Sequence, residues 1–280
     1  MKTKIGIIAP ANSIVGEQSI LNFKTGIKIL EDNGFEVIIG KNVYSTSDGY
    51  CGTTKEKLDD IYEVTKKAKY ILCATGGINS NNILNELDFN KIKNNIFIGN
   101  SNPILLFNSF YSINNQVSFI GPNVKTIGKM KSSFVIDSLK DKILNNSKKV
   151  VTEEQNIVIK EGTASGISIG GNIQSLRRII GTKYFPNVEN SIFYIEADPT
   201  ETNHTEFYSI INQFIQANVF EKCNGIIVGS YDSLNFIKDV FKNFNLPIVM
   251  CKNMGHNVNN NMMPIGKKIE IKKDGSIDEL

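Results

Sequence analysis

The 280-residue sequence has no tryptophan, only two histidines, and four cysteines without a C-x-x-C pair. No apolar run approaches the ~20 residues that a membrane-spanning helix needs, and the lysines are not gathered into a basic block. We therefore expect no membrane span and no nucleic-acid partner. The cysteines stand mostly in apolar runs, which favours buried thiols in a reducing compartment over disulfides or a metal site.

The first residues, MKTKIGIIAPAN, imitate a signal peptide with two lysines, an apolar run and an A-P-A sequence. The apolar core from Ile5 to Ala9 is shorter than the ~7–15 residues of an export signal. A first strand that ends at Pro10 explains the pattern better. With 41% hydrophobic residues, 21% charged residues and a net charge of +3, we expect a soluble cytoplasmic protein.

Short apolar strands alternate with amphipathic helices in the first half of the chain. Helical spacing predicts helices at 18–33, 55–69 and 79–93, with a fourth after Pro103. This alternation is typical of βαβ units with a parallel sheet, so an α/β fold is predicted. The strands expected between the helices are KIGIIAP, FEVIIG, YILCATGG and IFIGNS.

The alternation weakens between Lys125 and Gln155, where a polar, charge-mixed segment predicts a domain boundary. We expect an N-terminal α/β domain at 1–148, a linker at 149–156 and a C-terminal β/α domain at 157–280. The second domain is expected to begin with glycine-rich β structure, followed by a helix at 173–181. Its later elements are the strands SIFYIEA, NGIIVGS and LPIVMCKNMGH and the helix TEFYSIINQFIQANVF.

Unusual polar residues follow four of the predicted strands, at 74–81, 99–102, 195–198 and 253–257. In open parallel sheets, ligands bind at the carboxyl ends of the strands. Two of these segments lie in each half of the chain, so a site between the domains is predicted.

Ser101, in the turn GNSNP, allows two interpretations. It is ordinary turn chemistry if Asn102 caps the next helix with Pro103 at its first position. It is a nucleophile if its hydroxyl stands at the strand end beside the helix amides, which can stabilise an oxyanion. A serine nucleophile needs a base, and His256 follows an apolar strand whereas His204 lies in a polar run. His256 is therefore the expected partner.

A third residue should be a carboxylate that fixes the imidazole tautomer. Glu196 ends the strand SIFYIE, where a carboxylate is costly unless it is paired; Asp198 is the alternative. A local lysine or backbone amides would also satisfy Glu196. Gly77, in the turn TGG, brings bare backbone close to a ligand and could supply an oxyanion amide, although a simple tight turn would also use it.

Seven motifs follow one another from Ile5 to Gly266: IGIIAP, CATGGINSNNILNELDF, FIGNSNPILL, IGPN, GISIGGNIQSLRRIIGTKYFP, FYIE and MGHNVNNNMMPIG. In this order they resemble the LD-carboxypeptidase family, serine peptidases that include the microcin C immunity peptidases. The resemblance implies a flavodoxin-like N-terminal domain, a smaller C-terminal swivelling β/α domain and a homodimer. It also implies a catalytic Ser-Glu-His triad and no metal or cofactor. The implied residues are Ser101, Glu196 and His256 for catalysis and Gly76, Gly77, Asn102 and Asn172 for substrate binding, with oxyanion amides from Gly77 and Asn102.

The expected activity is hydrolysis of the L,D-amide bond to a terminal D-amino acid in cytoplasmic muropeptides, through an acyl-enzyme. The alternatives are a microcin-immunity-type amidase acting on an aminoacyl-nucleotide, and a non-catalytic peptide-binding homologue. A thiol enzyme using Cys73 or Cys251 is disfavoured because both stand in apolar strands. The sequence departs from the family's common G-Y-S-D at Asn100 and Asn102, and it has Thr75 where the carboxypeptidase branch often has arginine.

Overall fold

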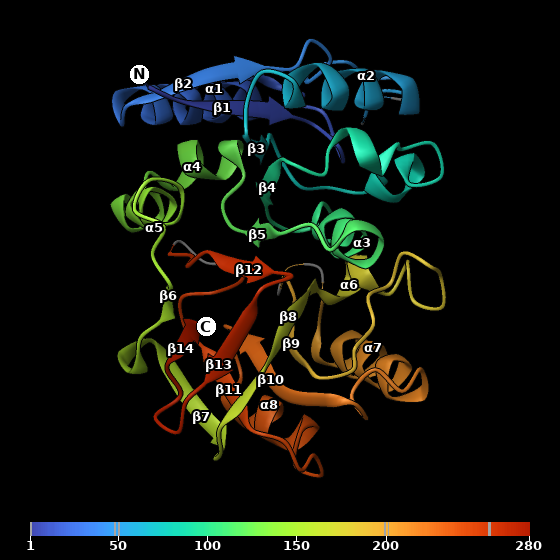
Figure 1. The fold of residues 1–280 in the computed structure, drawn as a ribbon, viewed down its shortest axis with the longest axis vertical. Helices are drawn as coiled ribbons and strands as arrows, with labels where there is room; N and C mark the ends of the chain where they lie inside the picture. Colours follow the sequence, from blue (N-terminus) through green and yellow to red (C-terminus); the bar gives the residue numbers. More distant parts are fainter. Residues whose placement is uncertain (1, 48, 50, 199, 201, 257–258) are drawn as a thin grey trace.

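Two β-sheets lie one above the other along the long axis of the molecule, with helices packed against each (Figure 1). The computed structural model describes residues 2–47, 49, 51–198, 200, 202–256 and 259–280. The first sheet contains, in order across it, β12 (Met263–Ile265), β5 (Ser118–Ile120), β4 (Ile96–Gly99), β3 (Tyr70–Cys73), β1 (Thr3–Ile8) and β2 (Phe35–Ile39).

The strands β1 to β5 are parallel, in the spatial order 2-1-3-4-5. This is the flavodoxin-like order, so the predicted fold of the N-terminal half is confirmed. Along β1, Ile5 and Ile7 enter one core cluster and Ile8 enters another, because side chains alternate between the two faces of a sheet. The apolar run KIGIIAP therefore reflects a strand that is buried on both faces.

The helices of the first half cover the two faces of the sheet. One face packs against α1, α4 and α5, and the other against α2 and α3. Among the described residues, no helix is long and apolar enough to cross a bilayer. The bounds are α1 (Glu17–Asp32), α2 (Thr54–Thr65), α3 (Ile104–Asn114), α4 (Val124–Met130) and α5 (Ser133–Ile143).

The helix predicted at 79–93 is wrong. The structure has only two short 3-10 turns there, η1 (Ser80–Ile83) and η2 (Phe89–Lys91). Asn79 has a left-handed φ of +68°, and the Asp88 side chain accepts a hydrogen bond from the Asn90 amide. Short polar side chains compete in this way with the helical backbone pattern, and the segment is rich in them.

The second sheet mixes parallel and antiparallel strands. β8, β9, β10 and β11 are parallel to one another, and the strands at either side run antiparallel to them. In order across the sheet the strands are β6 (Lys149–Val151), β14 (Ile277–Glu279), β13 (Lys268–Ile271), β8 (Ala164–Asn172), β9 (Ser191–Glu196), β10 (Cys223–Gly229), β11 (Ile248–Cys251) and β7 (Asn156–Lys160).

The helices of the second half are shorter than the sequence pattern predicts at one place. The helix expected at 173–181 ends at Leu176, and Arg178 and Ile179 continue as turns with hydrogen bonds three residues back. Gly181, with φ of +78°, ends the segment. The helices are α6 (Ile173–Leu176), α7 (His204–Gln216) and α8 (Leu234–Val240), and a third 3-10 turn is η3 (Glu153–Gln155).

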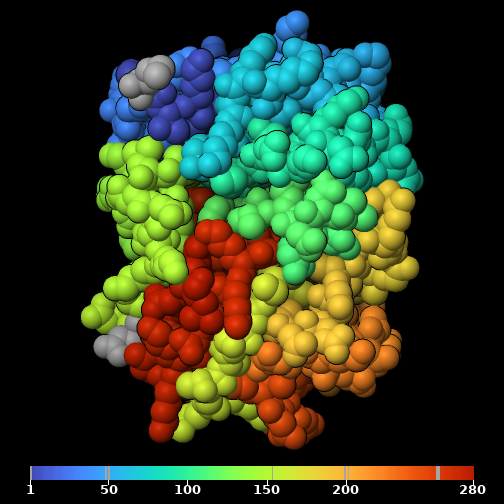
Figure 2. Space-filling model, viewed as in Figure 1, coloured from blue at the N-terminus to red at the C-terminus, as the bar shows by residue number. Residues whose placement is uncertain are grey.

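The two halves share one continuous core across the seam between the sheets. Helix α3 packs directly on β8 because Gly171 has no side chain. A Cβ at this position would lie only 2.4 Å from the Ile104 side chain. The Asn108 side chain on α3 exchanges two hydrogen bonds with the backbone of Gly170, at 2.9 and 2.8 Å. In the space-filling view, the red C-terminal strands meet the green segments along a broad contact (Figure 2).

Two segments lie differently from the predicted division of the chain. β12, in the segment assigned to the C-terminal domain, pairs antiparallel with β5 of the first sheet. The expected linker at 149–156 contains β6, which pairs with β14. Both differences have one cause: edge strands pair with whichever sheet edge the packed halves present, which local polarity does not reveal.

Candidate active site

Ser101 stands at the sharp turn between β4 and α3. Its φ is +65°, in the left-handed region that residues other than glycine seldom adopt. A strand-to-helix turn of this kind presents a side chain at the end of the sheet, and Ser101 is partly exposed there. Backbone strain of this sort is concentrated at functional sites.

Asn102, the next residue, is a buried connector. Its Oδ1 accepts hydrogen bonds from the Ser80 amide at 2.9 Å and the Ser80 hydroxyl at 2.6 Å. Its Nδ2 donates to the hydroxyl of Ser175, at 3.3 Å. Helix α3 begins at Ile104 with Pro103 as the N-cap and without a side-chain cap, so the interpretation of Asn102 as the helix cap is wrong. Asn102 is fully buried and is not among the residues that line the pocket around Ser101. Because its side chain is occupied, only its backbone amide, directly after Ser101, is left for a substrate.

Asn172 caps helix α6. Its Oδ1 accepts hydrogen bonds from the amide and the hydroxyl of Ser175, at 3.0 and 2.7 Å. The side chain is buried, and Asn172 is not among the residues that line the pocket around Ser101. The structure thus gives Asn172 a capping role and no place in the pocket wall.

The paired glycines lie against the serine. A Cβ at Gly76 would stand 2.8 Å from Cβ and 3.0 Å from Oγ of Ser101, and one at Gly77 would overlap the Asn12 side chain. Gly77 also has a φ of +122°. Asn12 fixes this loop, since its Oδ1 accepts a hydrogen bond from the Ile78 amide at 2.9 Å. Within the described part of the chain, the amides of Gly77 and Asn102 donate no hydrogen bond.

His256 contacts the carboxylate of Glu196. Nδ1 of the imidazole lies 2.7 Å from Oε2 of Glu196, whose side chain is fully buried at the end of β9. Two asparagines hold the backbone just before the histidine. The carbonyl of Gly255 accepts hydrogen bonds from Nδ2 of Asn260 at 2.9 Å and from Nδ2 of Asn100 at 3.5 Å. A buried carboxylate on Nδ1 fixes the ring orientation and the tautomer.

Asp198 approaches the other nitrogen of the same ring. Its Oδ2 lies 3.6 Å from Nε2 of His256. Burial works against its charge, but hydrogen bonds from the hydroxyl and amide of Thr200, with the charges of His256 and Lys129, outweigh it and lower the pKa of Asp198. Of the two carboxylates the sequence left open, Glu196 is therefore the one on Nδ1, and Asp198 faces the nitrogen that would exchange a proton with a serine.

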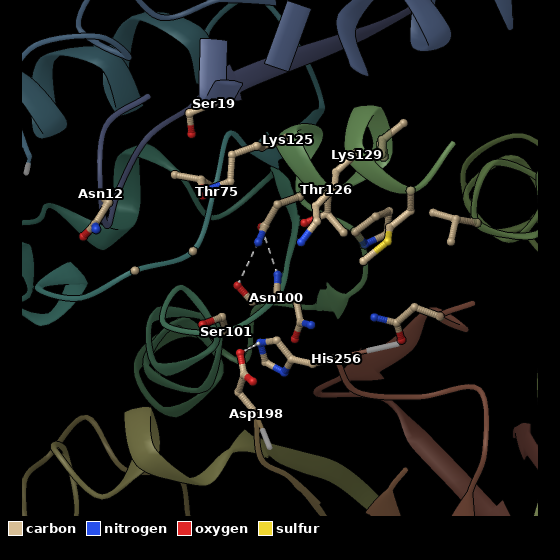
Figure 3. A pocket seen from close by; sticks show the side chains of 18 of the residues that line it. Asn12, Ser19, Thr75, Asn100, Ser101, Lys125, Thr126, Lys129, Asp198 and His256 are labelled. Carbon is tan, nitrogen blue, oxygen red and sulfur yellow. Dashed lines mark hydrogen bonds and ion pairs between the residues drawn. The ribbon is translucent and has the colours of Figure 1, made fainter. Parts of the chain in front are cut away.

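A pocket of about 530 Å³ opens over these groups (Figure 3). Ser101, His256, Asp198 and the paired glycines line it together, with helix α4 on the far side. Its size is in the usual range for small-molecule sites. Glu196 lies behind the histidine and does not reach the pocket surface.

The remaining candidates lie elsewhere. His204 begins α7, where its ring stacks on Phe236 with centroids 4.1 Å apart. Burial raises the pKa of the Cys251 thiol to about 12 and raises that of Cys73 further, which disfavours the thiolate that a cysteine nucleophile needs. In the described ranges, no group of His, Cys, Asp or Glu is arranged to hold a metal ion.

The pocket also contains residues that the sequence did not single out. Helix α4 brings Lys125 and Lys129 into its wall, and Asn123 links α4 to the serine turn. The side chain of Asn123 forms a pair of hydrogen bonds with the backbone of Asn100, at 3.1 and 3.2 Å. The sequence could have revealed this helix, because the apolar residues Val124 and Ile127 stand at helical spacing.

Models of known protein families match both halves of the chain. Residues 5–121 match the LD-carboxypeptidase N-terminal domain, and residues 165–271 match the LD-carboxypeptidase C-terminal domain. The interval between the matches contains the predicted linker at 149–156.

Individual relatives align with this chain over nearly their whole length. The Bacillus subtilis protein YocD, named as a carboxypeptidase, is 26% identical over 94% of this chain and 91% of its own. The structure of an MccF-like protein from Bacillus anthracis superposes with a TM-score of 0.91 at 24% identity, covering 100% of this chain and 97% of that one. A muramoyltetrapeptide carboxypeptidase from Oxalobacter formigenes superposes with a TM-score of 0.84 at 20% identity, covering 99% and 98%.

Proposed function

We propose, since the chain belongs to the LD-carboxypeptidase family, that it is a serine carboxypeptidase whose triad is Ser101, His256 and Glu196. One observation carries the proposal. A serine at a strained strand-to-helix turn shares a pocket with an imidazole whose Nδ1 lies 2.7 Å from a buried carboxylate. This combination of nucleophile, base and orienting carboxylate is the arrangement that acyl transfer requires.

In the proposed reaction, the Ser101 hydroxyl attacks the scissile carbonyl carbon while Nε2 of His256 takes its proton. The C–N bond then breaks, and His256 passes the proton to the leaving amine of the terminal amino acid. Water attacks the acyl-enzyme by the same route and restores the serine, so the shortened peptide leaves with a new carboxylate. Glu196 keeps the proton of the neutral ring on Nδ1 and stabilises the imidazolium that forms.

The amides of Gly77 and Asn102 are the proposed oxyanion donors. Both are without a hydrogen-bond acceptor among the described residues. Asn102 follows Ser101 in the chain, and Gly77 lines the same pocket as Ser101, next to Gly76. Each such donor is worth roughly 3 kcal/mol of barrier. Because a backbone amide does not depend on the side chain, asparagine at 102 can serve as well as the aspartate common in the family.

The proposed substrate is a muropeptide that ends in a D-amino acid, cleaved at its L,D-amide bond. The pocket lining supports a peptide: its described residues include small and polar side chains, two lysines and one aspartate, and no phenylalanine, tyrosine or tryptophan. We further propose that the enzyme works as a homodimer in the cytoplasm, in the recycling of cell-wall peptides, as the family resemblance implies.

An immunity-type reaction on an aminoacyl-nucleotide uses the same chemistry and is the second candidate. The MccF-like structure from Bacillus anthracis favours it through overall fold alone. A nucleobase is usually held by stacking on an aromatic ring, and the described pocket lining offers no such ring besides the imidazole. Peptide hydrolysis is therefore the function that this geometry supports better.

The test is Ser101→Ala, assayed for release of D-alanine from a tetrapeptide with L-lysine or diaminopimelate before the D-alanine. The rate should fall by at least ~10⁴-fold, as removal of a triad serine does. Ser209→Ala, on the exposed face of α7, is the matched control and should keep the wild-type rate. D-alanine release by Ser101→Ala at the wild-type rate would end the serine mechanism.

Labelling separates an enzyme from a non-catalytic binder. A serine-directed phosphonate should modify Ser101 in the wild-type protein, and peptide mapping by mass spectrometry should locate the adduct. A binder without turnover would remain unlabelled. The second candidate is tested with an aminoacyl-nucleotide in the same assay, where cleavage of that compound in preference to the tetrapeptide would favour it.

A further inference from the structure

Two lysines of α4 form one wall of the pocket. Lys125 and Lys129 stand four residues apart, so their side chains leave the same side of the helix, and both line the pocket. Figure 3 shows them across the pocket from Asp198 and His256. Positive charge is thus concentrated on the wall that faces His256, the base of the proposed mechanism.

Helix α4 is fixed relative to the serine. The Asn123 side chain holds the backbone of Asn100, next to Ser101, through its two hydrogen bonds. The backbone amide of Lys125 donates to the carbonyl of Ala74 at 2.9 Å, just before the paired-glycine turn. The position of Lys125 is therefore coupled through backbone contacts to the same two loops that form the proposed oxyanion site.

Neither ammonium group contacts a carboxylate directly among the described residues, although the charge of Lys129 acts on Asp198 and helps to lower the pKa of that carboxyl. Across the described residues, neither lysine forms a side-chain hydrogen bond or an ion pair. Lys125 is half-buried, and burial together with the charge of Lys129 lowers its pKa. Asp198, the carboxylate that lines the same pocket, is engaged by Thr200 and His256. A partly buried charge without a partner is costly, and an anion in the pocket would relieve that cost.

We propose that Lys125, assisted by Lys129, binds an anionic group of the substrate, namely the carboxylate of the terminal amino acid. This inference rests on the proposed function. In a peptide cut at its last amide bond, the terminal carboxylate carbon is three bonds from the scissile carbonyl carbon. When that carbonyl lies at Ser101, the carboxylate falls within the same pocket, where these lysines supply the positive charge.

The experiment compares one tetrapeptide as the free acid and as its C-terminal amide. Wild-type kcat/KM should favour the acid. Lys125→Met should lower kcat/KM for the acid by roughly ten- to hundredfold, the effect of losing a charge-assisted hydrogen bond, and leave the amide nearly unchanged. Lys125→Arg should restore most of the preference. Lys129→Met should reduce it less.

The control is Lys131→Met, at the exposed C-terminal end of α4 and outside this pocket, which should leave both rates unchanged. The preference for the acid should also decline as the pH rises through the lowered pKa of Lys125. An acid-to-amide ratio that stays at the wild-type value in both Lys125→Met and Lys129→Met, with unchanged thermal unfolding, would overturn the subsite while leaving the serine mechanism standing.

Two soluble probes identify the source of the anion. D-alanine should inhibit competitively if the lysines bind an amino-acid carboxylate. If they bind a phosphoryl group, inorganic phosphate should inhibit instead, and this result would overturn the carboxylate assignment. If the protein hydrolyses neither peptide, the proposed function fails. Calorimetric titration with D-alanine then decides the subsite, since binding that Lys125→Met abolishes supports it, and no binding to the wild-type protein overturns it.

Discussion

Gly76 can lie against Ser101 because it has no side chain. The space where a Cβ would stand is already within 3.0 Å of the Ser101 hydroxyl. Its φ lies outside the left-handed region, so an alanine there would meet crowding and no backbone strain.

Gly76→Ala should therefore displace the serine and leave the fold intact. We expect kcat on the tetrapeptide to fall by about 10² or more, because misplacement of a reacting group by about 1 Å has effects of that size. Thermal unfolding should change little. Gly52→Ala is the control: Gly52 lies outside the pocket, and the nearest atom to a Cβ there is a flexible carboxylate oxygen of Glu56 at 3.1 Å. An unchanged kcat would show that Gly76 does not confine the serine.

The two carboxylates beside His256 differ by which nitrogen they contact. Glu196 is on Nδ1 at 2.7 Å, and Asp198 is on Nε2 at 3.6 Å. Only the first contact is compatible with a serine on Nε2. Asp198 instead lies beside the nitrogen that the proposed mechanism assigns to the serine hydroxyl. Hydrogen bonds from Thr200, with the charges of His256 and Lys129, lower its pKa.

At the scale of elements, Asn102 joins three of them. Its side chain, at the start of α3, bonds Ser80 of η1 and Ser175 of α6. The hydroxyl of Ser175 already donates its hydrogen to Asn172, so it can only accept from Asn102. An amide, which has both a donor and an acceptor, satisfies this junction, and a carboxylate does not.

Asn102→Asp, the residue common in the family, should consequently destabilise this protein. It keeps the acceptor for Ser80 but places a carboxylate oxygen opposite a hydroxyl with no hydrogen left to give. The free energy of unfolding should fall by about 1–3 kcal/mol, measured by denaturant titration. Asn102→Asp combined with Asn172→Ala, which releases the Ser175 hydrogen, should show less than the sum of the single effects. Additive effects would contradict this account of the junction.

At the scale of the whole molecule, a buried ion network ties the chain end to both halves. Glu279 on β14 contacts Lys142 of α5 at 2.7 Å and Lys267 at 2.6 Å. Both Lys142 and Glu279 are almost fully buried. Burial lowers the pKa of Lys142, although Glu279 opposes that change.

Glu279→Gln should destabilise the protein by about 3–5 kcal/mol, because it leaves a buried ammonium without its counter-ion. The measurement is again the free energy of unfolding from denaturant titration. The double variant Lys142→Met with Glu279→Gln should recover part of the loss, since it removes the uncompensated charge. A loss no larger than for Lys272→Met, whose ion pair is more exposed, would mean that the network is not a stabilising link.

Much of the fold could be predicted from local pattern. The alternation of buried strands with amphipathic helices specified a parallel sheet, since burial on two faces requires continuous apolar runs and burial on one face of a helix requires a 3.6-residue period. The pattern failed at 79–93, where Asn79 has a left-handed φ and the Asp88 side chain accepts a backbone hydrogen bond, and at β12, which joins the sheet of the other half.

By itself, the sequence determined the class of the fold and reduced the possible bases to two histidines, because both follow from composition and from neighbours along the chain. Only the tertiary structure decided that Glu196 contacts Nδ1, that the side chains of Asn102 and Asn172 bind Ser175, and that Lys125 lines the pocket. These facts depend on how two sheets pack against each other. Contacts between distant segments are set by that packing, and no local period encodes them.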